Sequence, residues 1–291
     1  MAAYSQTFNF NFKFLAFIGL WALDTKNESM KLLYCVYQSF VIFLYGSFIT
    51  LEYFDLYFIR HDLVEFNFGL CLTVAISTYF VKILITLKNF PNIYRLRNRL
   101  NRKAEEEMDE DCKKILMEAV GEMKFLNKWF YTLTYGFIFG FWWFMPLWSK
   151  EEKKLPFREY IPFEYKFTPV YEILYFYQTC GSFIATNTII SLDVAIFGFM
   201  ISMSAEYDVL KCRISKLGMR DGNIMKEDEE ILKSIAEIVV RHQKIIQDIV
   251  EFEELFSTVN MLQFLQGAFV LSIILLDVTV VSFVSKCKCW N

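Results

Sequence analysis

The sequence is poor in the residues and motifs on which most enzymes depend. Only 2 of its 291 residues are histidines. It contains no glycine-rich phosphate loop, no G-x-S-x-G motif and no H-E-x-x-H motif. Its seven cysteines are scattered, without the C-x-x-C spacing of a metal or redox site. These absences argue against an enzyme and give no sign of a cofactor or a bound metal.

The chain also lacks a strong charge of either sign. Its formal net charge is -3, and its basic residues are interleaved with acidic ones, so we expect no nucleic-acid partner. A secretory signal is not evident either. Residues 1–30 include Asp24 and Glu28, and no small-residue cleavage site follows a short apolar core.

Apolar and aromatic residues are abundant instead. They make up 55% and 19% of the chain, with 32 phenylalanines and 16 tyrosines. This excess is typical of a protein whose outer surface also faces an apolar medium, so we expect membrane lipid around it. The predicted fold class is all-α, a multi-pass transmembrane helical bundle. Five runs have the length of a membrane span, namely 31–53, 64–87, 126–148, 170–204 and 257–284.

The distribution of basic residues predicts the orientation. Most of the 30 lysines and arginines lie in the N-terminal segment and in the connectors 88–128 and 205–256. Positive charge favours the cytoplasmic side, so the N-terminus is predicted to be cytoplasmic and the connector after the third span to lie outside.

A cytoplasmic helical extension, residues 226–256, is predicted to run directly into the fifth span. Apolar residues such as Ile235, Ile245 and Phe252 recur there every three or four positions. An exposed stripe of that length would promote aggregation, so we expect it to pack against the inner ends of other spans or against a partner chain.

Three ionisable residues within the spans have alternative interpretations. Asp193, midway along the fourth span, fits either an ion path or polar ligand contact, or a hydrogen bond between helices. Lys82 lies near the inner end of the second span, where its long side chain could reach the lipid headgroups. Asp277, in the outer half of the fifth span, fits either an ion path or ligand contact, or a hydrogen bond between helices.

Aromatic residues with a few polar groups gather at the outer ends of the second, third and fourth spans. Such a set could line an apolar pocket with a few hydrogen-bonding groups, although ordinary packing between helices would use the same residue types. The candidate ligand-binding residues are Phe68, Leu72, Phe141, Trp142, Met145, Gln178, Phe183 and Asn187.

The connector before the fourth span has an unusual composition. The stretch LPFREYIPFEYKFTPVYEILYFYQ, residues 155–178, holds three of the five prolines and nine aromatic residues. Proline disfavours helix at its own position and at the residue before it. We therefore expect an extended, non-helical cover over the pocket, followed by the fourth helix.

Three segments carry a resemblance to a known family. LPFREYIPFEYKFTPVYEILYFYQ resembles the second extracellular loop of insect odorant receptors, and RHQKIIQDIVEFEELFSTVNMLQFLQG resembles the entry to their fifth helix. FLAFIGLW (14–21) is similar to their short motif before the first helix. The resemblance implies a seven-helix plasma-membrane receptor with an intracellular N-terminus in sensory-neuron dendrites. It also implies a heterotetrameric, odorant-gated cation channel formed with a co-receptor subunit, with the volatile odorant in the outer half of the bundle.

The chain departs from this family pattern after the fifth span, where it ends in SKCKCWN. We therefore expect a single receptor domain, 1–291, that is C-terminally incomplete and gives no odorant-evoked current when expressed with the co-receptor. The alternatives are a non-conducting partner subunit and a fragment of a secondary transporter. A transporter would be expected to show broken spans and inverted repeats, and neither is visible.

Overall fold

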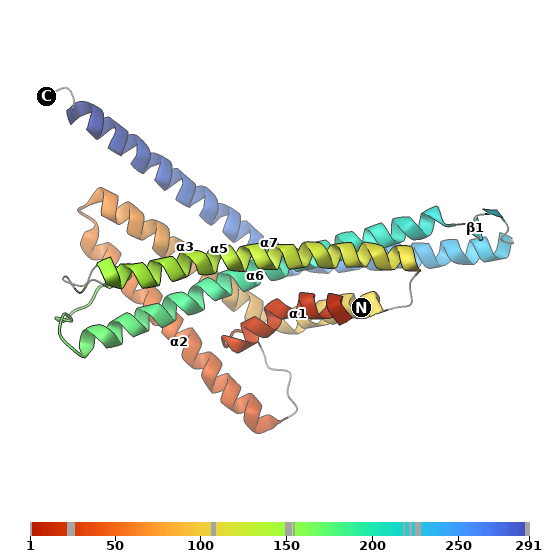
Figure 1. Cartoon of the computed structure of the whole chain (residues 1–291), viewed down its shortest axis with the longest axis horizontal. Helices are drawn as coiled ribbons and strands as arrows, with labels where there is room; N and C mark the ends of the chain where they lie inside the picture. The colour runs from red at the N-terminus through yellow and green to blue at the C-terminus, as the bar shows by residue number, and fades with distance from the viewer. Residues whose placement is uncertain are drawn as a thin grey trace. The chain divides into compact units, whose positions relative to one another are not determined.

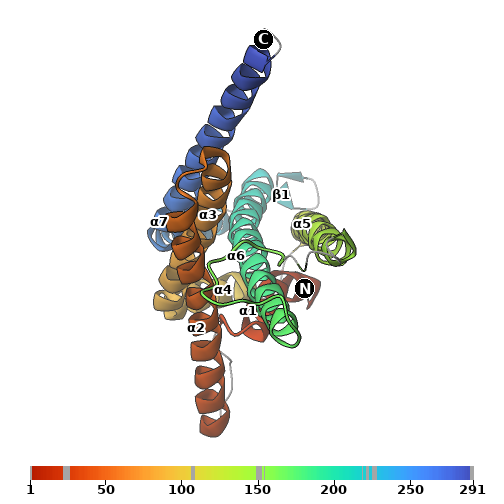
Figure 2. The ribbon, with the colours of Figure 1, turned by 90° about the vertical axis from the view of Figure 1, so that its left-hand side faces the viewer.

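The computed structural model describes residues 2–21, 27–105, 109–148, 153, 155–217, 219–220, 223–224 and 228–288. The helices are α1 (Ala2–Phe17), α2 (Glu28–Ile59), α3 (Leu63–Lys88), α4 (Phe90–Glu105), α5 (Glu110–Trp148), α6 (Val170–Ser215) and α7 (Asp228–Lys288) (Figure 1). Between α6 and α7, two short antiparallel strands, β1 (Met219–Arg220) and β2 (Asn223–Ile224), form a hairpin (Figure 2). The all-helical prediction is confirmed apart from this hairpin.

Short polar side chains fix the first residues of the apolar helices α2 and α3. Asn27 precedes α2, and its side-chain oxygen accepts a hydrogen bond from the backbone amide of Ser29 at 3.0 Å. Asp62 precedes α3 and accepts from the amides of Val64 and Glu65, each at 3.1 Å. Each cap satisfies amide groups that the first helical turn leaves without partners.

Among the described residues, four helices have the length and composition needed to cross a membrane: α2, α3, α6 and, within α7, Ile231–Thr279. The predicted spans 31–53, 64–87 and 170–204 lie within α2, α3 and α6, and the predicted span 257–284 lies within α7. The predicted span 126–148 falls within α5, whose last residues have side chains outside the described set. The extension 226–256 is helical from Asp228 and continues without a break into the last span, as predicted.

The chain divides into two compact units. The first comprises 1–14, 89–132 and 190–257, and the second comprises 15–88, 133–189 and 258–291. Four helices therefore contribute to both units.

The core of the first unit forms around Phe199 of α6, which is fully buried. Its ring lies 5.9 Å from that of Phe12 in α1, and 5.9 Å and 5.6 Å from those of Phe252 and Phe256 in α7. The guanidinium of Arg97 in α4 lies 5.3 Å from the Phe12 ring, so α1 and α4 pack side by side.

Helix α4 was not predicted, because it lies in a connector whose composition is largely polar. Its apolar residues Ile93, Leu96 and Leu100 recur at helical spacing, and all three are buried. Arg99 and Lys103 of α4 contact Asp248 of α7 at 3.0 Å and 2.8 Å. Helix α4 is thus held to α7 by ion pairs within the first unit.

The stripe of α7 packs as predicted only in its C-terminal part. Ile245, Phe252 and Phe256 are buried, whereas Ile235 and His242 are exposed in this chain. The packing partners are other helices of the same unit, which is one of the two alternatives expected from the sequence.

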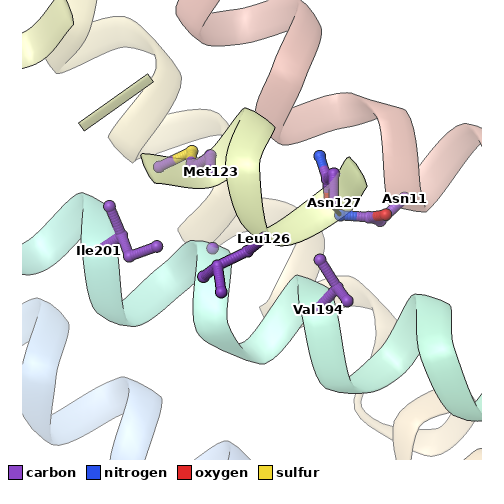
Figure 3. A pocket seen from close by; sticks show the side chains of 7 residues that line it. Asn11, Met123, Leu126, Asn127, Val194 and Ile201 are labelled. Carbon is purple, nitrogen blue, oxygen red and sulfur yellow. Dashed lines mark hydrogen bonds between the residues drawn. The ribbon is translucent and has the colours of Figure 1, made fainter. Parts of the chain in front are cut away.

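A small cavity of about 10 Å³ lies in the first unit, between α1, α5 and α6. Figure 3 shows Asn11 and Asn127 directed at each other beside the apolar side chains of Leu126 and Val194. The Asn11 side-chain amide donates to Asn127 at 3.1 Å. Because a cavity of this size holds one water molecule at most, it has no room for an odorant-sized ligand.

In the second unit, α2 packs closely against α3 and α6. The Tyr45 hydroxyl of α2 donates to the Ile76 carbonyl of α3 at 3.2 Å. A Cβ atom at Gly181 of α6 would lie 3.2 Å from the Phe48 ring, so only glycine allows this approach without movement. These contacts hold α2 at the centre of this unit.

Of the three ionisable residues singled out in the spans, Lys82 and Asp277 take part in hydrogen bonds between helices. Lys82 is fully buried and donates to Gln263 at 2.7 Å, so the prediction that it extends to the headgroups is wrong. Its partner lies 181 residues away, which the local sequence could not reveal. Asp277 accepts from the Asn67 side chain at 2.6 Å, in agreement with the helix–helix alternative.

Candidate ligand-binding site beneath the proline-rich connector

The largest described cavity of the second unit has a volume of about 600 Å³. Helices α2 and α3 form most of its apolar wall, through Leu56, Ile59, Val64, Phe68, Gly69 and Leu72. Phe137 of α5 and Pro156 and Phe157 of the connector complete the wall. Cavities of this size and composition accommodate small organic molecules.

We call residues 155–169 the roof segment, because Pro156, Phe157 and Arg158 line this cavity from outside the helices. It contains no helix or strand, which confirms the extended connector expected from its prolines. The ring of Phe157 packs edge-on against Phe48 of α2, with centroids 5.8 Å apart. The roof is therefore in direct contact with the helix beneath it.

Gln178 of α6 fixes the backbone of the roof segment. Its side-chain oxygen accepts from the Phe157 amide at 3.0 Å, and its side-chain nitrogen donates to the Phe157 carbonyl at 3.0 Å. Gln178 is fully buried, so both bonds are shielded from water.

An ion-pair network holds the next residue of the roof. The Arg158 guanidinium lies 3.4 Å from the Asp55 carboxylate of α2 and also pairs with Glu65 of α3. All three residues line the cavity. Helices α2 and α3 and the roof segment therefore meet at Arg158.

Two further carboxyl groups are buried beside this network. Glu52 of α2 lines the cavity, and its Oε2 accepts from Thr73 at 3.4 Å. Glu159 of the roof segment is buried next to it. Burial raises the pKa of Glu159 to about 7; a hydrogen bond from Gln178 lowers it, and the Asp55 carboxylate raises it further.

The predicted site residues fall into three groups. Phe68 and Leu72 line the cavity. Gln178 bonds to the backbone of the roof segment. Phe183 and Asn187 follow it along α6. The Asn187 side chain accepts from the Tyr135 hydroxyl at 2.5 Å and donates to the Phe183 carbonyl at 2.7 Å. Phe141, Trp142 and Met145 belong to the part of α5 whose side chains lie outside the described set. A role of all eight in ligand binding stays a prediction.

Sequence reasoning missed the charged residues of the site. Glu52 and Asp55 interrupt the apolar stretch TLEYFDLYF at the end of the first predicted span, where ionisable residues are costly. That signal was available and was applied only to Lys82, Asp193 and Asp277. No local pattern in the sequence indicated that Arg158 pairs with Asp55, because this contact depends on how the roof segment packs against α2.

The apolar helices, four of which could span a membrane, and the covered cavity define a multi-pass membrane protein with a site for a small molecule. The family model described as 7tm Odorant receptor matches residues 62–287. The chain therefore belongs to the 7tm odorant receptor family. A search of the curated proteins found no match.

Among solved structures, the chain is similar to the insect olfactory receptor OR5 from Machilis hrabei. One structure of that receptor matches with a TM-score of 0.71 at 15% identity, covering 91% of this chain and 69% of the receptor. The structure of the same receptor in complex with eugenol matches with a TM-score of 0.75 at 16% identity and the same coverage. Similarity at this level of identity establishes the fold.

Proposed function

We propose that the chain is an insect odorant receptor subunit that binds small, volatile, mainly apolar odorants in the 600 Å³ cavity beneath the roof segment. Family membership and the fold of a receptor solved with eugenol support this proposal. The observation that carries it is the cavity itself, whose wall includes the predicted residues Phe68 and Leu72. Burial of an odorant's apolar surface there contributes about 25 cal/mol per Å², offset by the cost of association.

The proposed mechanism is a shift between two states of the receptor. The subunit contributes to an odorant-gated cation channel with a co-receptor subunit, in the plasma membrane of a sensory neuron, with a cytoplasmic N-terminus. A ligand beneath Phe157 contacts a roof that Gln178 ties to α6 and Arg158 ties to α2 and α3. If the ligand fits one arrangement of these helices better, its binding free energy favours that state.

Direct binding provides the first test. The purified chain in lipid nanodiscs is titrated with eugenol and a panel of volatile esters and alcohols, and binding is followed by saturation-transfer NMR. We expect saturable binding of at least one compound, and competition between compounds that share the cavity. If no compound binds saturably, the proposal is wrong.

Co-expression with a co-receptor subunit tests the channel role separately. Odorant-evoked cation current that exceeds the current of the co-receptor alone supports a receptor subunit. Suppressed co-receptor current would instead identify a non-conducting partner, and solute uptake without current would identify a transporter.

A further inference from the structure

The cavity has an acidic side that its apolar walls do not explain. Its charged lining residues are Glu52, Asp55, Glu65 and Arg158. Arg158 pairs with Asp55 at 3.4 Å and with Glu65. The single cation of the described lining thus serves two carboxylates, and its described ion pairs do not include Glu52.

Glu52 is the most deeply buried of these groups, with 2% of its surface exposed. Its Oε2 has a long contact with Thr73, at 3.4 Å, and its Oε1 has no hydrogen-bond partner among the described residues. A buried acceptor without a donor costs free energy, and a ligand that supplies the donor removes this cost.

A second carboxyl group makes the surroundings of Glu52 more negative. Glu159 is buried nearby, and its Oε1 also lacks a partner within the described part of the chain. The two carboxyl groups lie close enough to repel each other when both are charged. Because of this repulsion, the two groups are not both ionised when no ligand is bound. A positively charged donor would stabilise an ionised carboxyl group, whereas a neutral hydroxyl would supply a hydrogen bond without a charge.

On these grounds we propose that the cavity selects small aryl- or alkylamines, with the Glu52 carboxylate as counter-ion to the ligand's ammonium group and the apolar walls around its hydrocarbon part. This inference rests on the proposed function, because it names the ligand class of the same site. An organic cation fits better than a metal ion, since no group of three metal-ligating side chains suited to a metal occurs among the described residues.

The test compares two ligands that differ in a single group, 2-phenylethylamine and 2-phenylethanol. Both are titrated against the full chain in nanodiscs at pH 7, where the amine is protonated. One charge-assisted hydrogen bond corresponds to about tenfold in affinity, so we expect the amine to bind about tenfold more tightly than the alcohol.

The variant Glu52→Gln should remove this preference by weakening the binding of the amine about tenfold, because the charged partner of its ammonium group is lost. Glu164→Gln is the matched control. It makes the same change of charge at an exposed position of the roof segment, and the preference should persist. The melting temperature of each variant shows whether it has folded.

The comparison of the two ligands on the unmodified chain tests the amine preference even if Glu52→Gln fails to fold. Equal affinities for amine and alcohol would overturn the amine preference and leave odorant binding standing. A preference that survives in a folded Glu52→Gln variant would show that Glu52 is not the counter-ion. Failure of both ligands, and of every compound in the panel of eugenol, esters and alcohols, to bind would overturn the proposed function as well.

Discussion

Gln178 of α6 makes two hydrogen bonds with the backbone of Phe157, accepting from its amide and donating to its carbonyl, each at 3.0 Å. One buried side chain thus replaces the strand or helix partner that this part of the roof segment lacks. The pairing explains how a connector without regular secondary structure keeps a fixed position above the cavity.

Replacing Gln178 with leucine should therefore loosen the roof. The change leaves the Phe157 amide and carbonyl without their partner, at a cost of about 1–3 kcal/mol in the free energy of unfolding. Thermal unfolding in nanodiscs measures this, and ligand affinity should fall with it. Gln243→Leu, at an exposed position of α7, is the control and should change neither quantity. Unaltered stability in Gln178→Leu would show that the two bonds do not hold the roof.

Phe68 should contribute to ligand binding more than to stability. Its ring lines the cavity but is 75% exposed in the chain without a ligand, so truncation removes few protein contacts. We expect Phe68→Ala to weaken binding of the best ligand about tenfold, since the lost ring contact is worth roughly 1–2 kcal/mol. Phe264→Ala alters a comparably exposed ring of α7 that does not line this cavity. Equal effects of the two variants would contradict a binding role for Phe68.

The ion pair between Arg241 and Glu206 should be important for the stability of the first unit. The two side chains meet at 3.0 Å, and that of Glu206 is almost completely buried. Arg241→Met leaves this carboxylate without its cation, which costs about 3–5 kcal/mol for a buried pair. Lys31→Met breaks the exposed pair with Glu28 and should cost less than about 1 kcal/mol. Chemical denaturation of both variants tests the contrast, and similar losses would contradict it.

The long apolar helices were predictable because length and composition alone mark them. The cap at Asn27, the break at Asp62 and the uninterrupted periodicity into the last span are all local signals. The roof segment was equally predictable, since its prolines exclude helix whatever surrounds them. Helix α4 was missed because its segment was judged only by its polar composition. The spacing of Ile93, Leu96 and Leu100, three and four residues apart, was a helical signal.

The charged part of the site could not be assembled from the sequence. Lys82 finds Gln263 181 residues away, and Arg158 reaches Glu65 across 93 residues. Spacing along the chain contains no information about such contacts. The aromatic residues at the helix ends were recognised as a group, but whether a ring lines a cavity or packs in a core depends on neighbours from other helices. Phe68 and Leu72 line the cavity, whereas Asn187 bonds to Tyr135 instead.

Glu159 should make the stability of the chain depend on pH. Burial raises its pKa from the ordinary 4.5 to about 7 in the folded state, so the folded chain holds this proton more tightly than the unfolded chain. Stability should therefore fall as the pH rises from about 5 to about 7, by about 3 kcal/mol at most, and then level off. Melting temperatures across this range measure the slope. Glu159→Gln should flatten it, whereas Glu164→Gln should not; a slope unaffected by Glu159→Gln would assign the titration to another group.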